Sequence, residues 1–310
     1  MSMVSGVGSG GVVGGGAAAV DTILFVDGVI GNGEARIVRR EHRYGGNAAI
    51  ALVAAARLGV TTKFIGHLPD ATHDEGLLAF LAEEGVELDN ARTDPSTYPI
   101  SSTILVGNDG ERFIAFDDDT QVGLPADLDL ELVRSARVLL VDEYGLQGGI
   151  RAAAAARDAD VSVVADIERA TDPDVQFLFD LANHLVVPRE LALSWTDTTT
   201  PADSVHALWR PDRAAVVVTG GSEGCWYRAE DEADPTAVKF HPALQVDVVD
   251  TTGCGDVFHG TYAAALAQGR PVTECVAEAT LAAAECATHP GGISPRPQEA
   301  SLRQGALSHP

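Results

Sequence analysis

Short apolar runs alternate with alanine-rich stretches of helical spacing from Val12 onward. The runs are several residues long and are followed by turn or helix signals, which is typical of strands buried on both faces. We expect strands at 63–66, 138–141, 161–165, 184–187 and 215–219, and helices near 47–58, 74–84, 149–156, 202–209, 256–267 and 273–286. Strands that alternate with helices predict a three-layer α/β fold with a doubly wound, mostly parallel sheet.

Two pairs of extended runs interrupt this alternation. They lie at 23–29 with 35–42, and at 101–106 with 111–117, and the second pair is joined by an Asp109-Gly110 turn. Asp-Gly is a favoured hairpin turn, so both pairs resemble antiparallel hairpins. We expect them to form a small separate β-sheet, a lid built from discontinuous segments at about 21–44 and 98–118.

The first eleven residues are glycine, serine and valine without periodicity, which predicts a flexible leader at 1–11 and one folded domain over 12–310. The leader contains Gly6-x-Gly8-x-x-Gly11, nominally a dinucleotide-binding fingerprint. That fingerprint requires a preceding strand, and only five residues precede Gly6. We therefore interpret the segment as a tail.

Charge and composition restrict the class of partner. The chain has 310 residues, 45% of them hydrophobic, and a formal net charge of -24. That charge opposes attraction to nucleic acid and to anionic membrane surfaces, so small molecules are the expected partners. The four cysteines include no CxxC pair, which is typical of reduced thiols. With no apolar stretch of membrane-spanning length and no signal-peptide pattern, we expect a cytoplasmic protein.

The candidate chemistry lies in one turn. Residues 246–250 have the pattern of a strand, 251–255 form a glycine-bearing turn, and an alanine-rich helix follows. The first turn of a helix presents unpaired N–H groups and the positive end of its dipole, so it binds anions. Asp256 lies in that turn, where an ionised carboxylate is stabilised and accepts a proton from a hydroxyl. The alternative is an ordinary helix cap.

The run Asp250-Thr251-Thr252-Gly253-Cys254-Gly255-Asp256 resembles the Asp-Thr-x-Gly-x-Gly-Asp motif of the PfkB (ribokinase-like) carbohydrate kinases. The stretch 246–260 looks most like the sulfofructose kinase and ketohexokinase types. The resemblance implies a ribokinase-like fold and transfer of the γ-phosphate of MgATP to a primary hydroxyl of a small, ketohexose-like sugar. Asp256 would be the base, and the amides of Gly253, Cys254 and Gly255 would receive the developing charge.

The same resemblance implies where the sugar binds. Gly45-Gly46-Asn47 matches the glycine pair that opens a helix in the family, and Asp21 is placed where relatives hold two sugar hydroxyls. Ketohexokinase-type members have a second asparagine at the position of Ile50, so one sugar contact is lost or replaced. Arg43 and Arg112 are candidate partners for an anionic sugar.

The nucleotide site follows from the resemblance as well. No Gly-x-x-x-x-Gly-Lys-Ser/Thr sequence is present, which excludes a P-loop. The segment 218–224 matches the family's Thr-x-Gly-x-x-Gly turn, so Thr219, Gly221 and Gly224 would contact the triphosphate. Thr252 would also contact ATP, and the adenine would lie against Ala283, Cys286 and Ala287.

Metal ions are implied in the same way. Magnesium is expected with ATP because it offsets the charge of the phosphates. Glu190 survives from the family's Asn-x-x-Glu motif and would hold Mg²⁺ through water. Asp250, Thr252 and Ser294 would hold a possible K⁺. The paired lid sheets of relatives imply a homodimer.

Two other functions remain open from the sequence. A ribose or nucleoside kinase would have the same fold, and fold alone does not separate these substrates. A sugar-sensing protein that lost catalysis is the alternative outside the enzymes.

Overall fold

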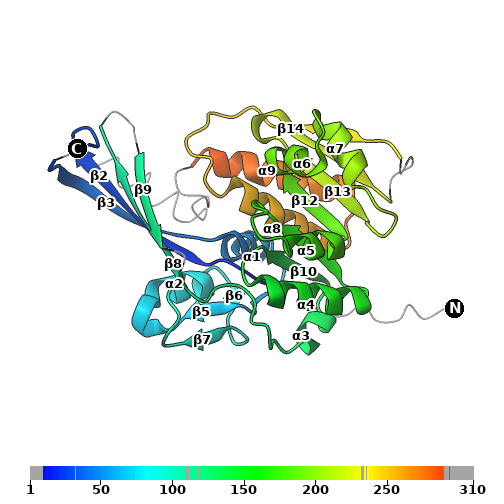
Figure 1. Ribbon diagram of the computed structural model, residues 1–310, viewed down its shortest axis with the longest axis horizontal. Helices are drawn as coiled ribbons and strands as arrows, with labels where there is room; N and C mark the ends of the chain where they lie inside the picture. Colours follow the sequence, from blue (N-terminus) through cyan, green and yellow to red (C-terminus); the bar gives the residue numbers. More distant parts are fainter. Residues whose placement is uncertain are drawn as a thin grey trace.

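A nine-stranded sheet forms the centre of the computed structural model (Figure 1). The structure describes residues 10–289 and Ile293, except positions 32, 109–111, 118, 232, 233 and 235. The strand order is β15-β14-β13-β12-β11-β10-β1-β4-β6, and the strands from β13 to β6 pair in parallel. The strands are β1 (Val12–Gly15), β4 (Thr62–Phe64), β6 (Val86–Glu87), β10 (Val138–Asp142), β11 (Ser162–Asp166), β12 (His184–Pro188), β13 (Ala215–Thr219), β14 (Gly224–Ala229) and β15 (Lys239–Pro242).

Helices cover both faces of this sheet, as the sequence predicts. One face packs against α1 (Asn47–Arg57), α8 (Cys254–Ala267) and α9 (Val272–Ala287), and the other against helices that include α4 (Leu146–Asp158), α5 (Val175–Leu181) and α7 (Pro201–Leu208). The remaining helices are α2 (Ala71–Glu83), α3 (Glu131–Ser135), α6 (Arg189–Thr196) and the short 3₁₀ turn η1 (Gly221–Glu223).

Alternate residues of the central strands enter the two cores. In β10, Val138 and Leu140 face the α1/α8/α9 layer, whereas Leu139 and Val141 face the α4/α5 layer, and all are at most 1% exposed. Because both faces are covered, the strands are continuous apolar runs without a polar side. The three-layer prediction is confirmed.

A second sheet of four strands projects from this body (Figure 1). Its order is β3-β2-β8-β9, formed by β2 (Ala19–Asp27), β3 (Arg36–Gly45), β8 (Ile100–Val106) and β9 (Arg112–Asp117). The expected antiparallel pairs are present, and β2 pairs in parallel with β8, with Asp21 opposite Ser102. The strands begin at residue 19 and end at 117, close to the limits expected for the lid. A two-stranded sheet of β5 (His67–Pro69) and β7 (Arg92–Asp94) lies apart from both.

The predicted strand at 246–250 is wrong. These residues have no strand partner, and Val246, Val248 and Val249 are 37%, 61% and 61% exposed. The backbone amides of Val249 and Asp250 instead donate to the Ala287 carbonyl at the end of α9, at 2.8 and 3.2 Å. The segment is therefore an extended crossing that leads from the sheet edge to α8.

The described part of the chain begins at Gly10, just before β1. The carbonyl of Gly11, which the sequence assigns to the leader, accepts hydrogen bonds from Arg137 and Val138, while residues 1–9 lie outside the described part.

Among the described residues, no helix is both long and apolar enough to cross a membrane.

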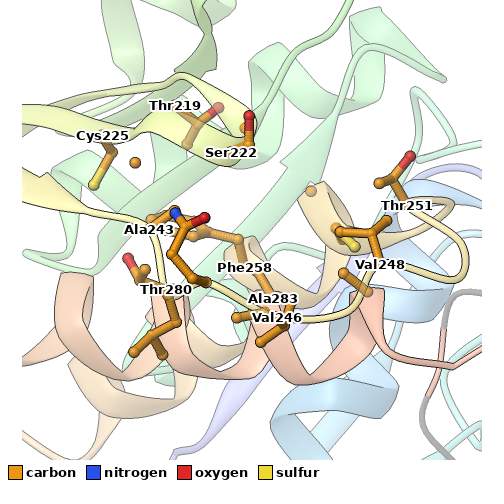
Figure 2. Close-up of a pocket in the computed structure, with 18 residues that line it drawn as sticks. Thr219, Ser222, Cys225, Ala243, Val246, Val248, Thr251, Phe258, Thr280 and Ala283 are labelled. Carbon is orange, nitrogen blue, oxygen red and sulfur yellow. The ribbon is translucent and has the colours of Figure 1, made fainter.

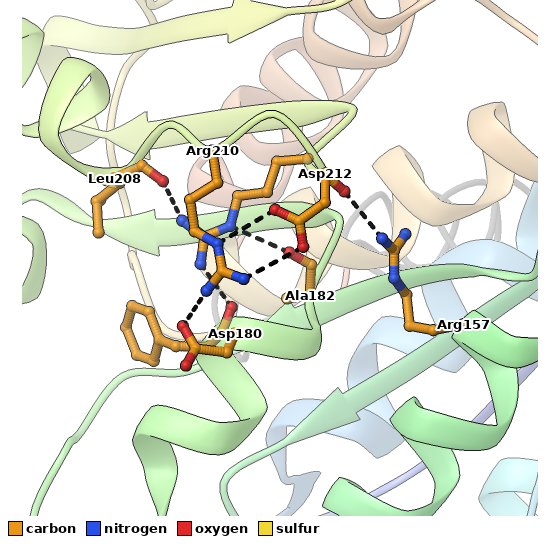
Figure 3. Close-up of polar contacts among 8 residues, drawn as sticks. Arg157, Asp180, Ala182, Leu208, Arg210 and Asp212 are labelled. Atoms are coloured by element: carbon orange, nitrogen blue, oxygen red, sulfur yellow. Dashed lines mark hydrogen bonds and ion pairs between the residues drawn. The ribbon is translucent and has the colours of Figure 1, made fainter.

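A buried guanidinium joins the C-terminal ends of α5 and α7. Arg213 is 3% exposed and donates to the carbonyls of Phe179, Ala182 and Leu208, and burial lowers its pKa to about 10. Its neighbour Arg210 lies outside this core and pairs with Asp180 and Asp212 (Figure 3). Arg213 thus satisfies carbonyls at the ends of helices that have no further helical partner.

Candidate active site

The turn before α8 is bordered by two cavities. Thr251, Cys254 and Gly255 line one of them, and Thr252, Gly253 and Asp256 line the other. Gly253 precedes the helix with φ 75°, a left-handed conformation that favours glycine. The chain thus reverses between the cavities, and the first turn of α8 lies between them.

The amides of this turn differ in their availability. The Cys254 N–H donates to the Thr251 carbonyl at 3.3 Å, so it is partly engaged in the turn. Within the described part of the chain, the Gly255 and Asp256 amides have no hydrogen-bond acceptor. The Gly253 amide likewise has no acceptor among the described residues, so of the three expected donors only the Cys254 N–H is engaged.

Asp256 is half-buried, and its environment differs from the one expected from the helix terminus alone. Burial raises the pKa of its carboxyl well above the ordinary value, and the negative charges of Asp166 and Glu168 raise it further. Desolvation and repulsion thus oppose the stabilisation that the helix terminus provides to the ionised carboxylate.

The first cavity has a volume of about 320 Å³ and apolar walls (Figure 2). Thr219 and Ser222 border it from the β13–β14 side, and Thr280 and Ala283 border it from α9, with Phe258 of α8 between. Two of the glycines expected at the nucleotide also line it, Gly221 and Gly224, as does Ala287.

Cys286 does not line this cavity. It is 1% exposed and lies behind the wall, where it packs with Cys254 and contacts the Thr252 carbonyl at 3.8 Å. Its side chain therefore supports the turn rather than facing the cavity.

The second cavity, of about 330 Å³, lies between the turn and the four-stranded sheet. Asp21, Gly45 and Gly46 line it together with Asp256, so the structure brings these sequence-predicted residues together. Ile50 also lines it and places an apolar side chain where the resemblance implies a second asparagine. The remaining lining residues are Ile23, Phe25, Arg39, Arg43, Tyr44, Ile104, Val106, Val249, Asp250, Thr252 and Gly253.

The loop before α1 is shaped for close approach. Gly46 has φ 96°, and a Cβ at this position would lie 2.5 Å from the Ala17 carbonyl oxygen, so no other residue fits. The Nδ2 atom of Asn47 is buried and has no hydrogen-bond partner among the described residues. A buried amide without a partner is costly, so this group is available to a further hydrogen-bond acceptor.

Two polar residues of this site were missed from the sequence. The hydroxyl of Ser102 in β8 donates a hydrogen bond to the Asp21 carboxylate. The buried carboxylate of Asp142 accepts from the amides of Ala17, Ala48 and Tyr144 at 2.7, 3.3 and 2.9 Å, which fixes the glycine loop and the start of α1. Asp142 ends a buried strand, a position that marks ligand-bearing edges of α/β sheets, and this signal was available in the sequence.

Asp250 is held by neighbours on both oxygens. Oδ1 accepts from the Thr252 amide and hydroxyl at 3.0 and 2.7 Å, and Oδ2 accepts from Arg43 at 3.1 Å. The Arg43 guanidinium comes from β3, so this contact joins the second sheet to the turn.

Asn47 and Glu190, like Cys286, are not among the residues that line either cavity, and two further predicted residues, Ser294 and Arg112, are not fully described. Glu190 of α6 has a side chain 76% exposed and contacts Arg189 at 3.4 Å. Ser294 lies outside the described residues, and for Arg112 only the backbone, in β9, is described.

Comparison with protein families identifies one match, the pfkB family carbohydrate kinases, over residues 12–299. Among curated proteins, "Fructokinase-1" of Zea mays is 28% identical over 289 residues, which cover 84% of this chain and 87% of that protein. "Probable fructokinase-6, chloroplastic" of Arabidopsis thaliana is 28% identical, and the match spans 69% of this chain but only 60% of that relative.

Solved structures share the fold. The ribokinase of Arabidopsis thaliana, complexed with ribose and ATP, superimposes with a TM-score of 0.81 at 24% identity, covering 97% of this chain and 99% of that chain. The ribokinase of Cryptococcus neoformans in complex with ADP gives 0.77 at 20% identity, covering 94% and 99%. At these identities the likeness is one of fold.

Proposed function

Because the chain belongs to the pfkB family of carbohydrate kinases, we propose that it transfers the γ-phosphate of MgATP to a primary hydroxyl of a small, ketohexose-like sugar, with Asp256 as the base. One observation above all supports this: residues 251–256 line both cavities, so a donor in one and an acceptor in the other meet at a single helix terminus. Phosphoryl transfer requires this arrangement of a base beside anion-binding amides.

The acceptor is assigned to the second cavity. Asp21 accepts sugar hydroxyls there, beside its bond from Ser102, and Gly46 permits close approach of the ring. Asn47 offers the unpartnered amide described above. The apolar wall that includes Ile50 suits a carbon face of the sugar rather than another hydroxyl.

The nucleotide is assigned to the first cavity. Its apolar wall from α9 suits an adenine ring, and Thr219, Gly221 and Gly224 lie on the side where the triphosphate would cross the strand ends. Two fold relatives are complexes with ATP or ADP, which supports this choice. The Gly253, Gly255 and Asp256 amides would then receive the charge of the transferred phosphate, and the Cys254 amide would contribute less.

A magnesium ion bound with ATP would offset the phosphate charge. Glu190 fits a role through water, because its exposed carboxylate is accessible to a hydrated ion. Potassium fits less well. Both oxygens of Asp250 already accept hydrogen bonds, one of them from a guanidinium, so the K⁺ that the resemblance implies at Asp250, Thr252 and Ser294 is not part of the mechanism proposed here.

The second sheet is proposed as the lid over the acceptor and as the contact of a homodimer. Ile114 and Phe116 of β9 are 53% and 65% exposed, and by register they share a face with Ile104 of the cavity. Apolar side chains exposed on a projecting sheet are stabilised when a second copy covers them. We place the enzyme in the cytoplasm.

The proposed function is tested by ADP release with a panel of ketohexoses, ribose and adenosine. Asp256→Asn is expected to lower kcat roughly 10²- to 10⁴-fold, the usual worth of a general base, with ATP affinity unchanged. Asp247→Asn is the matched control, an exposed carboxylate in the preceding segment, and should be fully active. Undiminished turnover in Asp256→Asn overturns the assignment of the base, and preference for ribose or adenosine overturns the acceptor class.

A further inference from the structure

The imidazole of His259 lies one turn beyond Gly255 on α8, inside the protein. It is 3% exposed, and both ring nitrogens contact carbonyl oxygens: Nδ1 lies 2.8 Å from the Gly255 oxygen and Nε2 lies 3.1 Å from the Val186 oxygen. Carbonyl oxygens only accept hydrogen bonds, and a neutral imidazole has a single N–H. The imidazolium alone donates to both, so the surroundings of this ring favour the charged form.

A buried carboxyl group lies beside the same nitrogen. Oδ2 of Asp166 lies 3.3 Å from Nδ1 of His259, and the two side chains are 2% and 4% exposed. That oxygen has no hydrogen-bond partner among the described residues. A buried carboxylate requires a positive partner or a proton, and His259 is positioned to be that partner.

The position of the ring relates it to the reaction. Its bond to the Gly255 carbonyl holds a residue that lines the first cavity, and its bond to Val186 fixes the same turn to β12. Asp256 lies three residues before it, in the same first turns of α8.

We propose that His259 is a positioning residue for phosphoryl transfer, which as an imidazolium anchors the first turn of α8 to β12 and supplies the positive charge shared by Asp166 and Asp256. This inference rests on the proposed role of Asp256 as base. It explains how a carboxylate so placed is kept ionised.

Several charged groups surround Asp256. Asp166 and Glu168 act from β11 and the segment after it, and His259 and Cys254 act from α8. The groups that line the cavity with Asp256 are Asp21, Arg39, Arg43 and Asp250. Burial, Asp166 and Glu168 raise the pKa of Asp256, whereas His259 lowers it. Because Asp166 and His259 shift the pKa of Asp256 in opposite directions, removing each of them in turn tests the proposal.

The first experiment is the pH profile of kcat/KM, whose acid limb follows the base of the free enzyme. His259→Asn removes the positive charge, so the acid limb should move to higher pH, by about one unit for a charge at this range. Asp166→Asn removes a negative charge, so the limb should move to lower pH. If His259 has only a structural role, His259→Asn lowers activity at all pH values and leaves the acid limb in place, and this result overturns the proposal. The proposal is also overturned if the acid limbs of the two variants move in the same direction.

A second measurement is independent of turnover. In ¹⁵N-labelled protein, both ring nitrogens of His259 should show imidazolium shifts at neutral pH, and Asp166→Asn should move them toward the neutral form. The buried His184, whose pKa is lowered to about 4 by burial, is the internal example of a neutral ring. A neutral His259 in the wild type overturns the proposal even if His259→Asn does not fold.

The two hypotheses fail in different ways. If Asp256→Asn is fully active, the base is wrong. If that variant is inactive and the acid limbs of the other two do not move, the base stands and the role of His259 is wrong.

Discussion

Arg43 of β3 donates to the carboxylate of Asp250 at 3.1 Å, across the boundary between the second sheet and the turn before α8. Their side chains are 23% and 14% exposed, so solvent screens the pair only in part. Arg43 also pairs with Glu41 of its own strand at 2.8 Å. The guanidinium thus links the proposed lid to the loop that leads to Asp256, the proposed base.

Arg43→Ala is expected to raise KM for the sugar and lower kcat/KM roughly tenfold, because it leaves a partly buried Asp250 without its charged partner. Steady-state kinetics at low and moderate salt measure this. Arg36→Ala is the matched control, because Arg36 lies on the same strand and its pair with Asp27 is 3.4 Å long and mostly exposed. Equal effects of the two substitutions would contradict the assigned role.

Turnover is expected to be the same in potassium and in sodium chloride of equal ionic strength. The physical reason is that Arg43 already provides the positive charge at Asp250, and Thr252 holds the other oxygen. ADP release under the two salts measures this directly. Strong stimulation by potassium would show that the ion displaces the guanidinium.

Cys254 is expected to be the first thiol alkylated, and ATP should protect it. A hydrogen bond from Cys286 lowers the pKa of Cys254, whose half-buried side chain lines the cavity proposed for the nucleotide, and the thiolate is the reactive form. Burial raises the pKa of Cys225 and of Cys275 to about 12, so these should react at least about tenfold more slowly. Peptide mass spectrometry after brief treatment with iodoacetamide gives the order. Labelling that ATP does not slow would argue against the nucleotide site.

Arg213→Met should lower the free energy of unfolding by about 3 kcal/mol, since three buried carbonyls lose their donor. Arg210→Met is the comparison, because Arg210 is 41% exposed and its ion pairs are worth less than about 1 kcal/mol (Figure 3). Urea unfolding of both variants tests the difference, and similar losses would refute it.

His184 should make stability depend on pH. It is buried against the hydroxyl of Tyr262 at 2.9 Å, and burial lowers its pKa from 6.5 to about 4. A depressed folded-state pKa means that stability is fully present above pH 6.5 and is lost as pH falls toward 4, by about 3 kcal/mol. His184→Gln should lack this part of the pH dependence, and the exposed His206→Gln should retain it. Parallel curves for all three proteins would disprove the prediction.

The central sheet was predictable because its strands are apolar on both sides and short turns separate them from helices. Val138 to Val141 is such a run, and its two faces enter two cores. The run 246–250 has similar valines but no strand partner, because the chain there is held by the end of α9. Apolar composition indicates burial or extension, but pairing depends on what lies beside the segment.

The site was predictable where one local motif contains it. Gly253 and Asp256 belong to such a motif, whereas Ser102 meets Asp21 only through the register of β2 and β8. Likewise, the pKa of Asp256 is raised by Asp166 of a distant strand, which the local sequence of the helix terminus does not reveal. The register between distant strands and the electrostatic effect of distant residues are the features of the candidate site that a local sequence motif does not reveal.

The bond between Asp21 and Ser102 joins positions 81 residues apart. Closing so long a segment costs conformational entropy, and the projecting strands recover little of it through burial. Separation of β2 from β8 would dismantle the acceptor side while the nine-stranded sheet stays folded. Heat would then abolish sugar phosphorylation before it melts the protein, and the upper working temperature would be that of the smaller sheet.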